Sequence, residues 1–109
     1  SGPFAHAALI NGGTETGIKQ DQAVITAEGL IGRVVEAGNS SARVLLLTDI
    51  NSRVPVITEK SREKSIMIGR GHELPSLSYL AAASQVIVGE RVITSGDGGV
   101  FPAGIPVGV

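Results

Sequence analysis

The stretch VITAEGLIGRVVEAG, Val24 to Gly38, carries the periodicity that decides the fold class. β-Branched residues lie on either side of a reversal at Glu28-Gly29, which is typical of strands joined by a tight turn. This pattern predicts a hairpin between Val24–Thr26 and Leu30–Val35, and strand periodicity continues along the rest of the chain.

A second pair of strands is predicted after this hairpin, in RVLLLTDINSRVPVITEK. Val44–Leu47 is apolar at every position, as in a strand covered on two faces, and Asp49–Ser52 supplies turn-forming residues. Because Pro55 has no backbone N–H, the strand around it is expected at a sheet edge or to begin there.

The segments beyond this pair alternate between charged turns and apolar strands. Glu59–Lys64 is expected to form an exposed hairpin tip, and Ser65–Gly69 the returning strand. The only helical candidate is Leu77–Gln85, an Ala-rich segment too short for its propensity to decide between helix and strand. Many short strands with glycine-bearing turns predict small barrels or sandwiches.

The chain also contains an internal repeat. IKQDQAVIT, Ile18 to Thr26, aligns with VIVGERVIT, Val86 to Thr94, and Asp21 in the first copy stands where the second has Gly89. A backbone position with positive φ favours Gly and tolerates Asp better than most other residues. We therefore interpret Asp21 and Gly89 as turn residues, and the repeat as two related β lobes or two equivalent hairpins of one lobe.

Composition restricts the possible classes of protein. The chain has 109 residues, enough for one domain or two very small ones, and with 42% apolar but 3% aromatic residues its core must consist of aliphatic side chains. Nine basic and ten acidic residues are dispersed along the chain, which argues against a nucleic-acid-binding protein. The start at Ser1-Gly2-Pro3 indicates an internal cut, so we expect a piece of a longer protein.

Near the end of the chain, TSGDGGVFPAGIPVG resembles the loop around the nucleophile of trypsin-like proteases. His6, Asp49 and a serine near Asp97 would follow the chymotrypsin order of triad residues. However, Gly98 stands where the nucleophile should be, and Ser95 precedes Asp97 by two positions. Without a hydroxyl beside the oxyanion-hole amides, acyl transfer is not expected.

Cofactor and metal sites are also not predicted. Phosphate-binding loops need glycines that open a helix, whereas Gly96–Gly99 precedes apolar residues and Pro102, and Asp97 would repel phosphate. Only His6 and His72 could serve as imidazole ligands, and neither has a second ligand pair at a useful spacing.

The glycine-rich stretch is instead expected to be a rigid, irregular connection between two strands. Glycines permit positive φ and prolines fix φ, and the turn residues with these roles are Gly96, Gly98, Gly99 and Pro102. The apolar residues of this connection, which are also the candidate protein interface, are Val100, Phe101 and Ile105. For Phe101 the favoured interpretation is a plug under the loop, and the alternative is an exposed anchor for another protein.

Three motifs together resemble the extracytoplasmic β-rich region of the rod shape-determining protein MreC family: GLIGRVVEAG, SARVLLLTDINSRVPV and VGERVITSGDGGVFPAGIPVG. ALINGGTETGIKQDQAVI is similar to the opening hairpin of the same family. The resemblance covers nearly the whole chain, although Asp21 replaces a usual glycine.

For the fold, the resemblance implies an all-β protein of two small β-barrels with little or no helix. Residues 1–109 would be a fragment of the extracytoplasmic region, truncated at both ends, with two small lobes. Missing strands would leave an edge exposed for pairing with another chain. The intact protein would be anchored in the bacterial inner membrane by an N-terminal helix outside this fragment and would lie on the periplasmic side.

For function, the resemblance implies a scaffold of the cell-elongation machinery that is not an enzyme. Its partners would be a class B penicillin-binding transpeptidase, RodA, MreD and MreB, together with further copies of itself. Two alternatives stay open, a divergent trypsin-like hydrolase and a peptidoglycan-binding module. The second has little support, because Tyr79 is the only Tyr and the chain has no Trp to stack on sugars.

Overall fold

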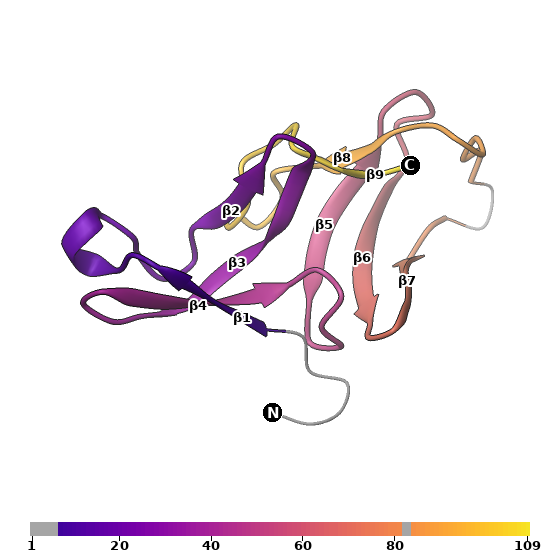
Figure 1. Cartoon of the computed structure of the whole chain (residues 1–109). Coiled ribbons are helices and arrows are strands. Elements are labelled where there is room, and N and C mark those ends of the chain that lie inside the picture. Colours follow the sequence, from indigo (N-terminus) through magenta and orange to yellow (C-terminus); the bar gives the residue numbers. More distant parts are fainter. Residues whose placement is uncertain (1–6, 82–83) are drawn as a thin grey trace.

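The computed structural model describes residues 7–81 and 84–109, which form two antiparallel β-sheets (Figure 1). The first sheet has the strand order β1-β4-β3-β2, and the second has the order β7-β6-β5-β8-β9. The strands of the first sheet are β1 (Ala7–Asn11), β2 (Ala23–Thr26), β3 (Gly29–Ala37) and β4 (Ser41–Leu46). Those of the second are β5 (Arg53–Thr58), β6 (Lys64–Arg70), β7 (Glu73–Ser78), β8 (Val92–Thr94) and β9 (Pro106–Gly108).

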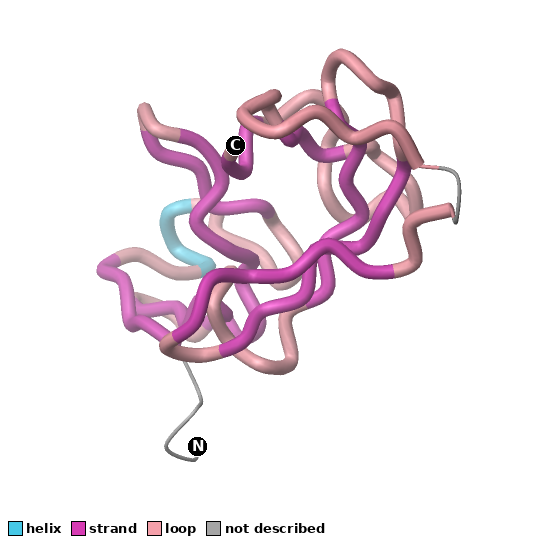
Figure 2. Tube along the Cα trace, turned by 90° about the vertical axis from the view of Figure 1, so that its right-hand side faces the viewer, coloured by secondary structure: helices cyan, strands magenta, loops and turns pink. Residues whose placement is uncertain are grey.

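The fold is all-β, as predicted. The second sheet curls into a half-barrel (Figure 2), and the molecule measures 47 × 29 × 23 Å. In the described part of the chain the only helical element is a single 3₁₀ turn, η1 (Thr14–Thr16). None of the described helical residues forms a segment that is long and apolar enough to span a membrane.

Two predicted hairpins are confirmed. β2 and β3 pair in antiparallel fashion with Thr26 opposite Gly29, around a turn at Ala27-Glu28 that lies one residue earlier than the predicted Glu28-Gly29. β5 and β6 pair with Ile57 opposite Lys64, and the charged residues between them form the hairpin tip. Both hairpins are local, so each could be predicted from the residues of its turn and flanking strands.

The second predicted pair of strands is wrong, because β4 and β5 belong to different sheets. β4 lies between β1 and β3, whereas β5 lies between β6 and β8. The turn at Asp49–Ser52 exists, but it carries the chain from one sheet to the other.

Of the two positions predicted for the strand around Pro55, the sheet edge is wrong, whereas β5 does begin nearby, at Arg53. Pro55 lies opposite Ile66 in a central strand, and its carbonyl accepts a hydrogen bond from the Ser95 amide on the β8 side. The pairing of β5 with β8 begins at Val56, so the missing N–H of Pro55 faces the point where β8 ends. A central strand therefore tolerates this proline because its neighbour is short.

The described part of Leu77–Gln85 contains no helix. Leu77 and Ser78 complete β7, opposite Met67 and Ile66, and Tyr79 then has a φ of 68°. Burial of Leu77 against the core stabilises the extended conformation over a marginal helix. Residues 82 and 83 of this segment lie outside the described residues.

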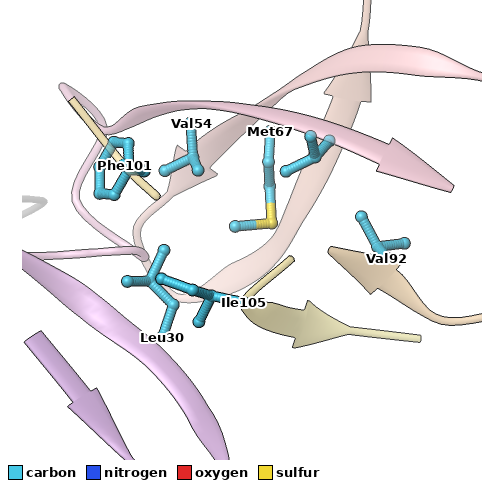
Figure 3. Close-up of a cluster of buried hydrophobic side chains, with 7 residues drawn as sticks. Leu30, Val54, Met67, Val92, Phe101 and Ile105 are labelled. Carbon is cyan, nitrogen blue, oxygen red and sulfur yellow. The ribbon is translucent and has the colours of Figure 1, made fainter. Parts of the chain in front are cut away.

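The apolar residues form two clusters, one large and one small. The large cluster lies mainly in the second sheet and contains Leu30, Val54, Val56, Met67, Val92, Phe101 and Ile105 (Figure 3). The small cluster lies in the first sheet and contains Val34, Ala42 and Val44. Separate cores are what two β lobes would need, and the division into lobes stays a prediction.

The first residues of β3 pack against the second sheet. The Leu30 side chain is buried in the large cluster with residues of the second sheet. Gly29 comes so close to β9 that a Cβ placed there would lie 2.4 Å from the carbonyl oxygen of Pro106. The sheets are therefore in direct contact where β3 begins.

Candidate functional site

The glycine-rich loop between β8 and β9 lies beside the first sheet and is held by Thr94 at its base (Figure 1). The buried Thr94 hydroxyl donates to the carbonyl of Pro102 at 2.6 Å and accepts the Ile105 amide at 2.8 Å. The Gly104 amide donates to the Thr94 carbonyl at 2.8 Å. The Thr94 amide in turn donates to the Ile105 carbonyl at 2.9 Å, so four hydrogen bonds at one residue fix an excursion of about ten residues. Sequence reasoning did not single out Thr94.

The loop glycines have the backbone conformation that their residue type favours. The φ values are 82° at Gly96, 78° at Gly98 and 74° at Gly99, and Pro102 follows as a hydrogen-bond acceptor of the loop. The two aligned turn residues of the repeat have φ values of 72° at Asp21 and 88° at Gly89. Each precedes a strand, but β2 pairs with β3 whereas β8 pairs with β5 and β9.

The three candidate interface residues are not equivalent. Phe101 and Ile105 are buried in the large cluster under the loop, whereas Val100 is 44% exposed. Phe101 thus lies where the plug interpretation put it, and only 6% of its surface is exposed. Of the three, Val100 alone presents an accessible apolar side chain.

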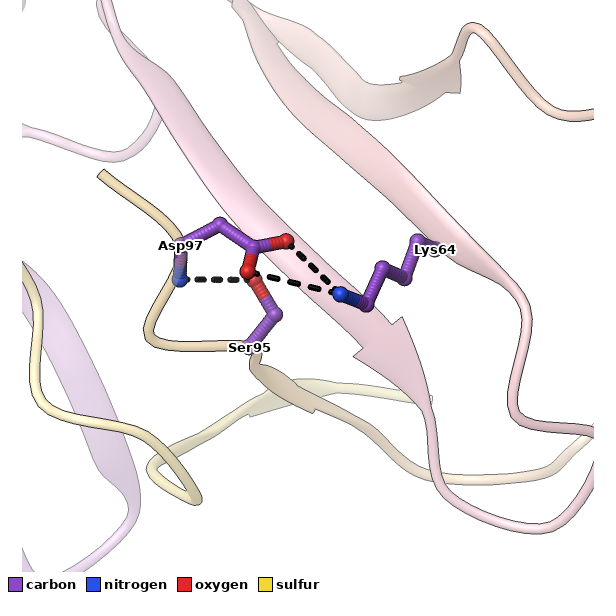
Figure 4. A network of polar contacts seen from close by, with 3 residues as sticks. All are labelled: Lys64, Ser95 and Asp97. Carbon is purple, nitrogen blue, oxygen red and sulfur yellow. Dashed lines mark hydrogen bonds and ion pairs between the residues drawn. The ribbon is translucent and has the colours of Figure 1, made fainter. Parts of the chain in front are cut away.

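A polar network ties the tip of the loop to β6 (Figure 4). Lys64 Nζ lies 3.3 Å from Asp97 Oδ2, and the Asp97 amide donates to Ser95 Oγ at 3.2 Å. Both charged side chains are more than half exposed, so this ion pair adds little stability. It joins the loop tip to Lys64, the first residue of β6.

The loop does not have the arrangement of a protease site. The Ser95 hydroxyl accepts a hydrogen bond from the Asp97 amide, and Asp97 pairs with Lys64. Asp49 lies in the turn between the sheets, where its carboxylate accepts the Asn51 amide at 2.7 Å. His6 lies outside the described residues. Within residues 7–81 and 84–109, no group of three or more His, Cys, Asp or Glu side chains could hold a metal ion.

Two hollows flank the loop between the sheets. One, of about 370 Å³, is lined by Arg33, Arg53, Pro55, Asp97, Gly98, Val100 and Phe101. The other, of about 610 Å³, lies along β2 and is lined by residues 19–23, Ile25, Gly98, Gly99, Val100 and Pro102. The loop therefore contributes to two hollows that combine charged and apolar groups, and concave surfaces of this kind are common places for ligand binding.

An apolar pocket of about 320 Å³ lies between β7 and β9, the two edge strands of the second sheet. Met67, Leu77, Val92 and Val107 line it, and Leu74 at its rim is 86% exposed. Edge strands carry backbone groups that can pair with another chain. This pocket is a second surface on which apolar contacts are available.

Glu90 forms a buried polar centre that sequence reasoning missed. Its Oε1 accepts the amides of Lys60 and Ser61 at 2.8 and 2.9 Å, and its Oε2 accepts the Ser61 hydroxyl at 2.7 Å and the Ile87 amide at 2.6 Å. Burial raises the pKa of Glu90, but hydrogen bonds from Ile87, Ser61 and Lys60 outweigh it and lower this pKa to about 2. The carboxylate joins the β5–β6 tip to the segment before β8. The one local feature of the sequence that could have indicated this role is the position of Glu90 directly after the turn residue Gly89, in VGE.

Comparison with known proteins places these features in a family. The sequence profile described as rod shape-determining protein MreC, barrel core, matches residues 1–109. The chain is 47% identical to the cell shape-determining protein MreC of Caulobacter vibrioides over 98% of its own length, which is 31% of that relative.

Solved structures agree with this result. The crystal structure of MreC from Pseudomonas aeruginosa superposes with a TM-score of 0.91 at 39% identity, covering 96% of this chain and 68% of that one. A high-resolution structure of the major periplasmic domain from the cell shape-determining filament MreC superposes with a TM-score of 0.81 at 27% identity, over 96% and 70% of the two chains. The chain spans about a third of the length of the curated relatives it matches.

Proposed function

Because the chain belongs to the family of the rod shape-determining protein MreC, we propose that it is part of a non-enzymatic scaffold of the bacterial cell-elongation machinery. Family membership is the observation that carries this proposal. In it, residues 1–109 are a two-lobed fragment of the extracytoplasmic region, on the periplasmic side of the inner membrane. The naming of one relative's region as a periplasmic domain supports this location.

The partners in this proposal are a class B penicillin-binding transpeptidase, RodA, MreD and MreB, and further copies of the same protein. A relative named as a cell shape-determining filament supports self-association. A scaffold of this kind acts through binding energy alone, because it favours whichever conformation of a partner it binds more tightly. Exposed Val100 and the rim of the β7–β9 pocket are the apolar surfaces that could contribute.

Cell shape in the bacterium from which the chain derives tests the proposal. Deleting the segment corresponding to residues 7–109 from the full-length protein is expected to convert rods to round cells. Ser95→Ala in the full-length protein is expected to leave rod shape unchanged, because a scaffold needs no nucleophile.

Two results would count against this function. Rods that persist after the deletion would contradict a role in cell shape. Rounded cells that contain normal amounts of folded Ser95→Ala protein would contradict the non-enzymatic part and revive the hydrolase alternative.

A further inference from the structure

The smaller hollow beside the glycine-rich loop has an arginine from each sheet in its wall. We call it the arginine hollow, after Arg33 of β3 and Arg53 of β5. Arg33 Nη1 lies 2.9 Å from Asp21 Oδ1, and Arg53 Nη1 donates to the carbonyls of Ile50 and Ser52 at 2.9 and 3.1 Å. These bonds hold each guanidinium through one nitrogen. Since a guanidinium has five N–H donors, both can also donate to a ligand.

The charges around the arginine hollow favour an anionic ligand. Two carboxylates are near it, and each has a cation as partner: Asp21 pairs with Arg33, and Asp97, which lines the hollow, pairs with Lys64. The hydrogen bonds of Arg53 described above go to neutral carbonyl oxygens. Of the charged side chains that line the hollow, Arg33 and Arg53 are positive and Asp97 is negative, which leaves one net positive charge. An arginine with several donors suits a carboxylate ligand.

The shape of the surroundings favours an extended chain over a free ion. Val100 and Gly98 line both the arginine hollow and the larger hollow, which extends along β2 as far as Ile25. β2 is an edge strand of the first sheet, so its outer side has no strand beside it. A peptide could therefore place one side chain among the arginines and continue along the larger hollow, with an aliphatic neighbour against Val100.

From this arrangement we propose that the arginine hollow binds a side-chain carboxylate of an extended segment of another protein, and that Val100 contacts the adjoining aliphatic residue. This inference rests on the proposed scaffold function and deepens it, because it states the chemistry by which a partner is held. Arg53 supplies the charge, and the loop held by Thr94 supplies the opposite wall.

Amide shifts in ¹⁵N–¹H spectra of the 109-residue chain test the proposal. The probes are the blocked peptide Ala-Val-Asp-Val-Ala, its neutral counterpart Ala-Val-Asn-Val-Ala, and that counterpart with a free C-terminal carboxylate. We expect the Asp peptide to shift the amides of residues 98–101 and the Arg53 side-chain N–H, and the blocked Asn peptide to leave them unchanged. Equal shifts with both blocked peptides, or none with either, would overturn the proposal. A response to the free C-terminal carboxylate alone would do so too, by assigning the hollow to chain ends.

A pair of arginine variants provides the matched control. Arg53→Gln is expected to weaken binding of the Asp peptide about tenfold or more, as loss of a charged hydrogen bond does. Arg43→Gln removes an exposed arginine of β4, which is paired with Glu36 of β3, and should bind like wild type. Unchanged affinity in Arg53→Gln would contradict the assignment.

A third variant guards against effects on folding, because Arg53 also bonds to the inter-sheet turn. Val100→Asp removes an exposed side chain, adds a negative charge to the hollow and is expected to abolish Asp-peptide binding in a folded chain. A folded Val100→Asp chain that binds like wild type would contradict the proposal. These outcomes are separate from those of the cell-shape experiment, so the arginine hollow can fail while the scaffold function stands.

Discussion

At the scale of single residues, Glu90 joins segments that are far apart in the sequence. Its carboxylate accepts hydrogen bonds from Lys60 and Ser61 on one side and from Ile87 on the other. Exposed ion pairs such as Lys64–Asp97 contribute little by comparison, because water solvates both partners. We therefore expect the geometry around β8 to depend on Glu90 more than on any surface charge.

Replacing this carboxylate by an amide tests that expectation. In Glu90→Gln, one oxygen can still accept the Lys60 and Ser61 amides, but the new NH₂ group faces the Ile87 amide, and two donors then oppose each other. We expect a clear fall in melting temperature at pH 7. Glu36→Gln, which alters an exposed ion pair at 3.6 Å, is the control and should change it little.

The pH dependence of unfolding also tests this role of Glu90, because the shift of its pKa fixes the direction in which stability changes with pH. The pKa of Glu90 is about 2 in the folded protein against an ordinary value of 4.5. The lowered pKa means that the carboxylate stabilises the fold fully above about pH 4.5, and this contribution is lost as the pH falls towards 2. The difference in melting temperature between wild type and Glu90→Gln should therefore shrink over that range. A difference that stays constant would contradict the role assigned to the carboxylate.

Residue-scale features differ in how far the sequence can predict them. A positive φ at Asp21 could be inferred because it depends on residue type and on alignment with Gly89. The contacts of Glu90 could not, since its partners Lys60 and Ser61 lie 30 and 29 residues away. The buried position of Phe101 was one of two interpretations, because a single apolar residue after glycines fits both a plug and an anchor.

At the scale of elements, the start of β3 is where the two sheets touch. Gly29 has a φ of 130°, which only glycine adopts readily, and the Pro106 carbonyl occupies the space of a side chain. Leu30 then enters the large core cluster. The hairpin turn thus also fixes how the two sheets meet.

Substitution of Gly29 should loosen this contact. Gly29→Ala places a methyl group 2.4 Å from the Pro106 carbonyl oxygen, and we expect a loss of about 1–3 kcal/mol from overpacking, in addition to backbone strain. Gly89→Ala is the control, because its φ is 88° but nothing lies within 4 Å of an added Cβ. Chemical denaturation measures both. Equal losses in the two variants would mean that the contact with β9 contributes nothing.

Elements joined by local turns could be predicted, whereas those set by distant pairing could not. The β2–β3 and β5–β6 hairpins follow from turn residues between alternating strands. Nothing local indicates that β4 and β5 separate into different sheets, or that a short β8 pairs beside Pro55. Likewise, the helical candidate Leu77–Gln85 has only a weak helical propensity, and pairing with β6 overrides it at Leu77 and Ser78.

At the scale of the whole molecule, the two sheets create surfaces that neither sheet has alone. The arginine hollow takes Arg33 from one sheet and Arg53 from the other, and the loop between β8 and β9 forms its remaining wall. The sequence of that loop, which resembles a protease loop, already marked this part of the chain as a candidate site. The net charge of the arginine hollow could not be predicted in the same way, because its arginines come from both sheets. A scaffold needs such surfaces because its effect on partners depends on binding alone.

Binding to a partner tests the central claim most directly. The measurement is calorimetric titration of the 109-residue chain with the purified extracytoplasmic domain of a class B transpeptidase from the same source. Circular dichroism on the same sample establishes that the chain is folded. The scaffold account predicts saturable binding of the two folded proteins. Absence of any binding by the folded chain would contradict the account.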